Sequence, residues 1–508
     1  MPTRHSSPVH LDVTVGREVG GSVPAPEIPF RIAVLGDFSG RANREIVATG
    51  SALAARRPVR VDRDNVELVL AGFRPELALP AVDRGDSRLR LEFTTLEDFH
   101  PDRLFQRLPL FRTLRETRAR LTDPATRAEA IEALVGGAAP APAAAESGPP
   151  RDAPADLLER VLEETTPVDA GAVDLAHGDL HAFLQRIVAP HLVPGVDPRE
   201  SELLNVLDEA VGAQLRAILH QPDFQGLEAL WRGIDFLTRR VETTAQLQIH
   251  LVDVSKVELV ADLAPGGEVE RSGLYRLLVE SSVGTFGGGE WALLVGAYSF
   301  GPGSEEIEVV GRLAGIAKAA GAPWISAADP ALAGWKSFDA PHDPSRPLEP
   351  EPAWGALRRL PDAPWLGLAL PRFLLRLPYG AESDPCELLP FEELESREHS
   401  RYLWGNPALV CALLLARSFV ASGWALHPGE DLEVTGLPLD LYRVEGETMA
   451  KPCAETLMTD RLAMQMSDRG FMPLASLKDS DAVRLVRFQS VADPPVGLAG
   501  RWVGSTRG

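Results

Sequence analysis

Apolar and polar residues alternate near the start of the chain in the pattern of short β-strands. Residues 10–15, the N-terminal arm, alternate in this way, which is typical of a strand with one buried face. That face would carry Leu11, Val13 and Val15. Residues 30–35 form a short apolar run, interrupted only by Arg31, that Gly36 and Asp37 end, as expected of a strand buried on both faces. Residues 89–93 alternate again, so several strands are predicted here.

Two further stretches of the first 135 residues have helical spacing. One begins at Val66, directly after an Asp/Asn-rich segment at 62–65 whose side chains are predicted to cap the helix. The other covers residues 98–121, with Pro101 near its first turn, a position that tolerates proline. Its apolar face would be formed by Leu104, Leu108, Phe111 and Leu114.

Beyond residue 200, long helical patterns give way to apolar runs. Residues 200–240 have helical spacing that Pro222 interrupts, and Asp223 is predicted to cap the second helix. Runs typical of strands follow at 247–252, 291–295 and 365–370. A helical pattern over 305–320 lies between two of them. Strands that alternate with helices favour an α/β fold with a buried sheet.

A tract rich in Pro, Ala and Gly covers residues 136–154, and such a composition cannot bury a core. We interpret residues 136–155 as a flexible to semi-extended linker between a domain at 1–135 and a domain at 156–508. A short amphipathic helix is predicted directly after it, over 156–164. The apolar face of that helix would be made of Leu157, Leu158, Val161 and Leu162. Because so short a helix is unstable alone, it either packs on its own domain or binds in a partner's groove.

The chain of 508 residues carries a formal net charge of −21. This acidity argues against a general nucleic-acid binder and against an electrostatic anchor on anionic membranes. The most apolar stretch, 408–426, is interrupted by Arg417 and a Ser-Gly pair, so we interpret it as a buried core helix rather than a membrane span. The first residues lack the apolar core of a signal peptide. The three cysteines lack paired metal-binding spacing, and buried thiols in a reducing cytoplasm are expected.

Motifs of phosphate binding and nucleophilic catalysis are missing from the sequence. No Lys follows a Gly, which excludes a P-loop. The Gly-rich loops at 34–40 and 284–289 are therefore interpreted as tight turns. No G-x-S-x-G elbow is present.

The sequence also gives little support for a metal site or for an acid–base pair. His177 and His181 are four residues apart, but Gly178 between them weakens a helix, so solvent-exposed or capping roles are favoured over a metal site. The acidic pairs at 305–306 and 392–393 are interpreted as solvated surface. We expect no enzyme activity, no cofactor and no metal.

Short segments in a shared order resemble the two subunits of the type VI secretion contractile sheath. Segments that resemble the small, VipA-like (TssB) subunit lie at residues 29–40, 61–65, 91–101 and 105–114. Segments that resemble the large, VipB-like (TssC) subunit lie at residues 218–233, 254–259, 284–288, 368–380, 402–407 and 459–461. The resemblance implies two sheath-like α/β modules, packed around mixed sheets with flanking helices and joined by the Pro/Ala-rich linker.

The resemblance also implies a mechanical function. Sheath subunits assemble in an extended state on a baseplate, as a hollow tube around an inner tube protein, and then contract. Neighbouring subunits exchange strands, and the N-terminal arm is our candidate for such a strand. The helix over 156–164 matches a region that the large subunit offers to a recycling AAA+ unfoldase, with its apolar face as the anchor. Self-assembly or assembly with other sheath subunits in the cytoplasm is expected, without nucleic acid or membrane insertion.

The chain departs from the family pattern in two ways. The subunits are normally separate chains, whereas a linker here would raise their effective concentration and fix a one-to-one ratio. The family's large subunit also continues for about a hundred residues, a domain-scale length, past the part that matches 488–491. We therefore expect that a second chain supplies that domain, or that the protein is an accessory. The alternative functions are a non-polymerising sheath-like adaptor or cap and, without any supporting motif, an enzyme on an unrelated α/β fold.

Overall fold

The computed structural model describes residues 24–25, 27–80, 88–135, 200–264, 266–281, 289–338, 352–444 and 446–502. The N-terminal arm, the predicted linker, the predicted helix over 156–164 and both His177 and His181 lie outside these residues. We call the described part of residues 24–135 the first module and the described part of residues 200–502 the second module.

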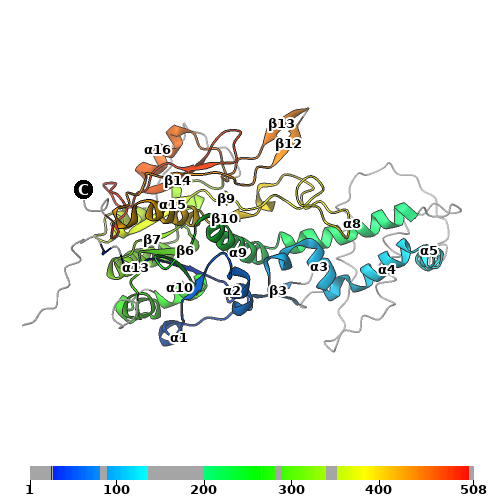
Figure 1. The fold of residues 1–508 in the computed structure, drawn as a ribbon, viewed down its shortest axis with the longest axis horizontal. Helices are drawn as coiled ribbons and strands as arrows, with labels where there is room; N and C mark the ends of the chain where they lie inside the picture. The colour runs from blue at the N-terminus through cyan, green and yellow to red at the C-terminus, as the bar shows by residue number, and fades with distance from the viewer. Residues whose placement is uncertain are drawn as a thin grey trace, which may run out of the picture.

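A mixed sheet of nine strands forms the centre of the described structure (Figure 1). In spatial order its strands are β11 (Glu433–Val434), β15 (Val483–Leu485), β14 (Phe471–Ser476), β8 (Leu366–Leu370), β7 (Trp324–Ala328), β6 (Leu293–Phe300), β1 (Phe30–Gly36), β5 (Leu247–Asp253) and β2 (Val59–Val61). The strands from β14 to β5 run parallel. Antiparallel strands flank them on both sides. The predicted α/β fold with a buried sheet is confirmed.

Strand β1 belongs to the first module but lies inside the sheet of the second. It pairs in parallel with β5, from Phe30 opposite Leu247 to Gly36 opposite Asp253, and with β6 on its other side. All of β1 except Arg31 is buried, which confirms the prediction of a strand covered on both faces. The two modules therefore share one sheet.

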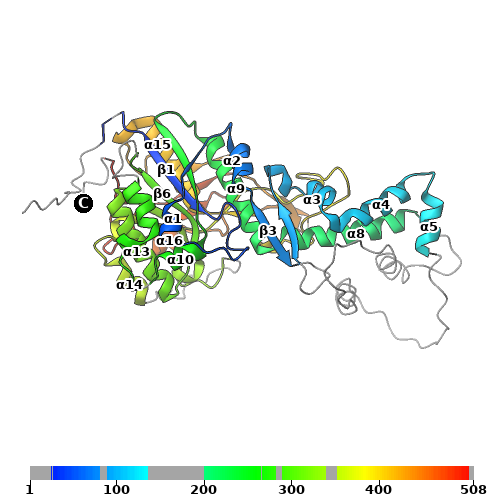
Figure 2. The same cartoon turned by 90° about the horizontal axis from the view of Figure 1, so that it is seen from below.

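Helices cover both faces of this sheet, and the side chains of β1 alternate between the two layers. Ile32 and Val34 pack in a cluster with apolar residues of α9 (Pro222–Arg240) and α15 (Pro407–Ser422). Ala33 and Leu35 pack in a cluster with α13 (Ser304–Ala320) and α16 (Asp460–Asp468). Figure 2 shows α15 and α13 on opposite sides of β1 and β6. The core is thus built from both modules on each face.

Helix α15 is both long and apolar. The stretch Pro407–Ala425 is long and apolar enough to cross a membrane, but 67% of its most apolar window is buried within the protein. It contacts β1, β6, β7 and β8. The prediction of a buried core helix is confirmed.

A second, elongated part of the molecule extends sideways from the sheet (Figure 1). Its long element is α8 (Glu200–Leu219) of the second module. Helices α3 (Pro101–Arg107) and α4 (Arg112–Thr122) of the first module pack on α8, and α5 (Arg127–Val135) packs on α4. The modules therefore meet along this extension as well as in the sheet.

The prediction of a single helix over 98–121 is wrong in detail, because the structure has several shorter elements there. A 3₁₀ turn at Leu96–Phe99 precedes α3, and another at Pro109–Phe111 precedes α4. Leu108 between α3 and the second turn is extended, with ψ 128°. Pro109 explains the break, because proline lacks a donor N–H and disfavours helical geometry in the residue before it.

Both predicted helix caps are also wrong. Helix α2 (Val66–Phe73) begins where expected, but the Asn65 side chain accepts a hydrogen bond from Asp62 N–H at 2.8 Å and does not cap the helix. Helix α9 is capped by Gln221, whose Oε1 accepts from the N–H groups of Asp223 and Phe224. Pro222 fills the first helical position, so the capping position falls on the residue before it.

The remaining elements are short. Three two-stranded hairpins or ribbons are described outside the main sheet: β3 (Glu76–Pro80) with β4 (Arg88–Glu92), β9 (Phe373–Leu374) with β10 (Trp404–Gly405), and β12 (Leu441–Val444) with β13 (Glu447–Ala450). Short helices are α1 (Gly50–Ala54), α10 (Lys256–Asp262), α11 (Gly273–Tyr275) and α14 (Pro352–Arg358). Strand β4 matches the alternation predicted at 89–93.

Candidate functional site

Polar and apolar contacts join the first and second modules, and we call them the module interface. Its apolar anchor is Trp231 on α9. The indole Nε1 donates a hydrogen bond to the Phe38 carbonyl at 3.0 Å. The rings of Phe38 and Phe73 lie 5.2 and 5.7 Å from the indole ring. Phe38 and Trp231 are fully buried, so α9 holds the loop after β1 by packing and by a hydrogen bond.

That loop, residues 36–40, is a tight turn, as predicted. Gly40 has φ +73°, and a Cβ there would lie 2.3 Å from the Glu76 carbonyl oxygen, so only glycine fits without a shift. The Asp37 carboxylate accepts from the N–H groups of Arg41 and Ala42. The loop therefore binds its own backbone where a phosphate cradle would bind a ligand.

Beside the loop, a carboxylate of the second module receives hydrogen bonds from the first. Ser39 Oγ donates to Asp253 Oδ2 at 2.6 Å, and Ser39 N–H donates to Oδ1 at 3.1 Å. Burial raises the pKa of Asp253 and that of Asp37. In open α/β sheets ligands bind outside the carboxyl ends of the strands, but here Asp253 at the end of β5 binds Ser39 of the first module, and Asp37 after β1 binds its own loop.

Glu258 on α10 is the electrostatic centre of the module interface. Its fully buried carboxylate lies 2.8 Å from Arg41 Nη2 and 2.5 Å from Arg56 Nη2, both of the first module. It also accepts from Ser255 N–H within a capping box. Burial would raise the pKa of Glu258, but the hydrogen bonds from Arg56, Arg41 and Ser255 hold it at about 2. The carboxylate is therefore ionised and fully paired near neutral pH.

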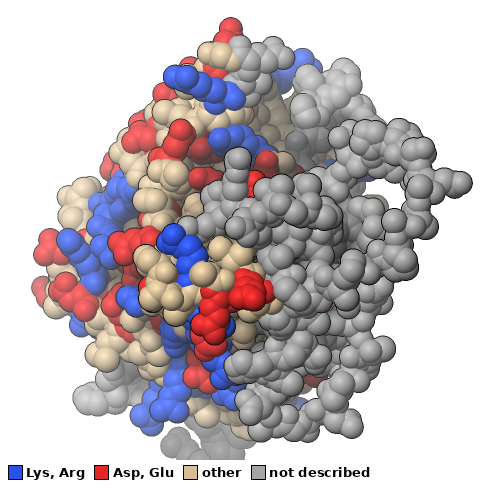
Figure 3. Space-filling model, turned by 90° about the vertical axis from the view of Figure 1, so that its right-hand side faces the viewer, with Lys and Arg blue, Asp and Glu red and all other residues tan. Residues whose placement is uncertain are grey.

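The extension adds a third set of contacts. Arg118 on α4 binds Asp208 on α8 through two hydrogen bonds, Nε–Oδ1 at 2.6 Å and Nη2–Oδ2 at 3.2 Å. Outside the extension, Asn43 Nδ2 donates to Asp223 in the first turn of α9 at 2.7 Å. At the end of the molecule where α5 and α8 lie, Figure 3 shows basic and acidic side chains interspersed over the described surface. Short-range pairing of opposite charges thus accompanies the helix packing.

A second constellation lies within the second module, and we call it the buried charge cluster. Arg376 donates to Glu228 at 2.8 Å and to Glu393 at 2.7 Å. Arg232 donates to Glu228 at 2.7 Å and to the Tyr379 hydroxyl at 2.8 Å. Glu228 and Glu393 are 0% and 1% exposed. The cluster fixes the loop after β9 to helix α9.

The interpretation of residues 392–393 as solvated surface is therefore wrong for Glu393. Burial would raise the pKa of Glu393, but the Arg376 charge and the hydrogen bonds from Arg376 and Tyr379 N–H, with His220 Nε2 at 3.6 Å, hold it at about 2. A carboxylate beside another acid looks like surface in a sequence, because its partner Arg376 is 17 positions away. Arg376 lay in a segment that resembles the family, but its pairing gave no local signal.

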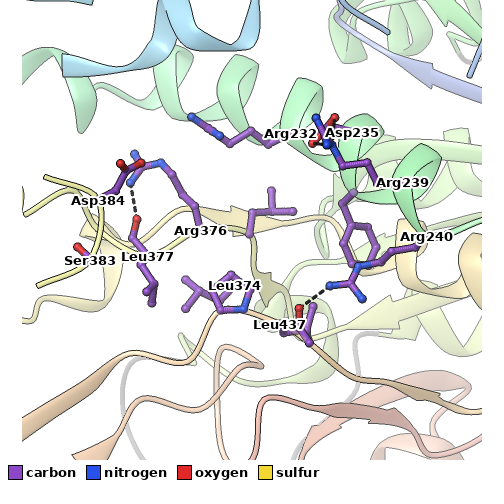
Figure 4. Close-up of a pocket in the computed structure, with 14 residues that line it drawn as sticks. Arg232, Asp235, Arg239, Arg240, Leu374, Arg376, Leu377, Ser383, Asp384 and Leu437 are labelled. Atoms are coloured by element: carbon purple, nitrogen blue, oxygen red, sulfur yellow. Dashed lines mark hydrogen bonds and ion pairs between the residues drawn. The ribbon is translucent and has the colours of Figure 1, made fainter. Parts of the chain in front are cut away.

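A cavity of about 720 Å³ borders the buried charge cluster (Figure 4). Its basic lining residues are Arg232, Arg239, Arg240 and Arg376. Each of these has a partner: Arg239 binds Asp235 at 2.6 Å, Arg240 donates to the Thr435 carbonyl at 2.7 Å, and the other two bind Glu228. The cavity therefore presents guanidinium groups already engaged with protein oxygens.

Burial weakens the cysteine thiols as nucleophiles. Burial raises the pKa of Cys411 and of Cys386 to about 12 and that of Cys453 to about 11. Cys411 and Cys453 are buried, as expected, whereas Cys386 is partly exposed. A protonated thiol is a poor nucleophile. Among the described residues, one group could hold a metal ion, namely His100, Asp102 and Cys386.

The residues predicted to bind partners cannot be placed in this geometry. Leu11, Val13 and Val15 of the N-terminal arm lie outside the described residues, and so do Leu157, Leu158, Val161 and Leu162. Of the Gly-rich loop at 284–289, Gly289 alone is described. The module interface was not predicted from single residues, because its members are far apart in the sequence: Arg41 and Glu258 are 217 positions apart, and Ile28 and Trp424 are 396 positions apart.

The module interface joins two distant chain segments into one fold, and comparison with known families identifies those segments. The family model described as "Type VI secretion system, VipA, VC_A0107 or Hcp2" matches residues 6–135. The model described as "EvpB/VC_A0108, tail sheath N-terminal domain", VipB, matches residues 201–492. The chain belongs to the type VI secretion sheath family, with a VipA-type and a VipB-type region in one polypeptide.

A curated relative supports the same assignment for the second module. The type VI secretion system sheath protein TssC1 of Pseudomonas aeruginosa PAO1 is 36% identical over 306 residues. The match covers 58% of this chain and 61% of that relative. The resemblance inferred from short motifs is thus confirmed.

Proposed function

We propose that this chain is a sheath protomer in which a small-subunit module and a large-subunit module are fused. The observation that carries the proposal is the position of β1 between β5 and β6, since a strand inside a sheet cannot leave without breaking both ladders. The linker keeps the two modules at a high effective concentration and in a one-to-one ratio. The protein then acts in the cytoplasm as a building block rather than as an enzyme.

Assembly of protomers proceeds in this proposal by strand exchange. The N-terminal arm, with Leu11, Val13 and Val15, adds to a sheet edge of a neighbouring protomer. Edge strands offer unpaired N–H and C=O groups, and β2 and β11 are the edges of the main sheet in the described structure. The assembled tube surrounds an inner tube protein, stands on a baseplate and contracts to propel the inner tube.

Disassembly uses the helix predicted over 156–164. Its apolar face of Leu157, Leu158, Val161 and Leu162 is a suitable ligand for a hydrophobic groove, and its position next to the linker makes it accessible after contraction. An AAA+ unfoldase that recycles the sheath is the proposed partner.

Electron microscopy of the purified full chain tests this function. We expect tubes or rings, and we expect Val13→Pro to abolish them, because proline removes a donor from the exchanged strand. Val19→Pro, outside the alternating segment, is the matched control and should leave assembly intact. Discrete particles for the unaltered chain, at all protein concentrations, would instead support a non-polymerising adaptor or cap.

A further inference from the structure

The start of α3 in the first module faces a loop of the second module. His100 is the residue that caps α3, and Asp102 lies in its first turn. Cys386 lies in the loop that leads to the buried charge cluster. One potential ligand atom from each of these side chains lies within 4.8 Å of the other two. Nitrogen, oxygen and sulfur ligands from two modules are thus gathered at one place.

The Asp102 and His100 side chains, and the backbone that follows Cys386, are held at this place by other contacts. Asp102 Oδ2 accepts from Glu387 N–H at 2.8 Å, and Oδ1 accepts from Leu388 N–H at 3.2 Å. These amides follow Cys386 directly, so the loop that carries the thiol is fixed against α3. The His100 ring stands edge-on to Tyr379 of the buried charge cluster, with ring centroids 4.8 Å apart. The group is therefore largely preorganised.

We propose that His100, Asp102 and Cys386 form a binding site for a divalent transition-metal ion, Zn²⁺, that clips the first module to the second. Imidazole, thiolate and carboxylate are the ligand types that Zn²⁺ uses. Ligand atoms around tetrahedral Zn²⁺ lie about 3.5 Å apart, given its bond lengths. The observed spacing requires the ligands to close by about 1 Å, which a rotation of the partly exposed Cys386 side chain supplies.

Asp384 is a candidate for a fourth ligand. Asp384 Oδ1 lies 3.9 Å from His100 Nε2, and its side chain is 62% exposed, so it can turn towards the ion. The His100 side chain is 15% exposed, which leaves a path from solvent to the site. A metal bound here ties α3 to the loop that also enters the buried charge cluster.

If these residues only join the modules by direct contacts, the Cys386 sulfur is not needed. Asp102 binds two loop amides, and His100 Nδ1 accepts from Asp102 N–H at 3.2 Å. Neither contact uses the Cys386 sulfur. In that case Cys386→Ser has the same metal binding as the unaltered chain.

Cobalt spectroscopy on the full chain tests the site, because Co²⁺ replaces Zn²⁺ and reports a thiolate ligand by a sulfur-to-cobalt charge-transfer band. We expect this band at one equivalent of Co²⁺, together with the visible bands of tetrahedral cobalt, and we expect Zn²⁺ to remove both. Cys386→Ser should abolish the charge-transfer band and weaken Zn²⁺ binding at least about tenfold, since even loss of an outer-shell partner costs that much.

Matched variants keep the test specific. Cys453→Ser preserves the hydrogen bond from that position to the Pro438 carbonyl and should leave the band unchanged. His177→Ala with His181→Ala should also leave it unchanged. Absence of a charge-transfer band at saturating Co²⁺, or a band that survives Cys386→Ser, overturns the proposal. The measurement uses unassembled protein, so its outcome is independent of whether the chain forms tubes.

Discussion

Arg376→Met is expected to destabilise the folded chain by about 3–5 kcal/mol at neutral pH, because it removes the shared cation from a buried ion network. Glu228 and Glu393 are 0% and 1% exposed, and Arg376 is hydrogen-bonded to both. Arg232 still binds Glu228 in the variant, but Glu393 keeps only His220, at 3.6 Å, and the Tyr379 N–H. Equilibrium unfolding in urea measures the difference.

The same variant should have an altered pH dependence. In the unaltered chain the pKa of Glu393 is lowered from 4.5 to about 2, because Arg376 and hydrogen bonds overcome the effect of burial. Glu393 thus contributes stability that is present above pH 4.5 and is lost as the pH falls towards 2. Without Arg376, burial dominates and raises the pKa. The stability difference between the two proteins should therefore shrink as the pH falls from neutral through 4.5.

Arg239→Met is the matched control for Arg376→Met. Arg239 borders the same cavity, but its side chain is 59% exposed and pairs with Asp235 one helical turn away. Such exposed pairs contribute less than about 1 kcal/mol. Equal losses of stability in the two variants would contradict the assignment of the buried charge cluster as a stabilising network.

Trp231→Ala is expected to cost about 3–5 kcal/mol, the range for truncating a buried tryptophan. The indole packs against Phe38 and Phe73 and donates to the Phe38 carbonyl, so the loss falls on the module interface. Hydrogen exchange should accelerate most in β1 and in the loop at 36–40, because local opening follows the weakened contacts.

Trp354→Ala separates an interface effect from general core loss. Trp354 is equally buried and stacks on Phe471, 5.1 Å between ring centroids, wholly within the second module. We expect a comparable loss of global stability, with exchange accelerated around β14 rather than β1. Unchanged exchange of β1 in Trp231→Ala would show that α9 does not hold the first module.

Much of the local structure could be predicted from hydrophobic patterning. The apolar runs at 30–35 and 247–252 correspond to β1 and β5, and the 305–320 pattern corresponds to α13. These predictions succeed because burial of both faces of a strand, or of one face of a helix, determines which neighbouring residues are apolar. Short motifs in a shared order were enough to identify the family.

Which residues and strands contact one another within the fold could not be predicted in the same way. Nothing in residues 30–36 specifies that Leu35 lies opposite Val252, since pairing between distant strands depends on the whole fold rather than on local sequence. Gln221 caps α9 instead of Asp223, because Pro222 sets the helix start. Glu258 and Glu393 look like surface acids in sequence, and their arginine partners are distant or in another module.

Cleavage of the linker tests most directly whether the two modules form one fold. A protease site placed within residues 136–155 allows the purified, folded chain to be cut between the modules. The fragments should then co-elute in size-exclusion chromatography without denaturant, because β1 stays between β5 and β6, and they should separate only on unfolding. Fragments that elute apart under native conditions would contradict a shared sheet.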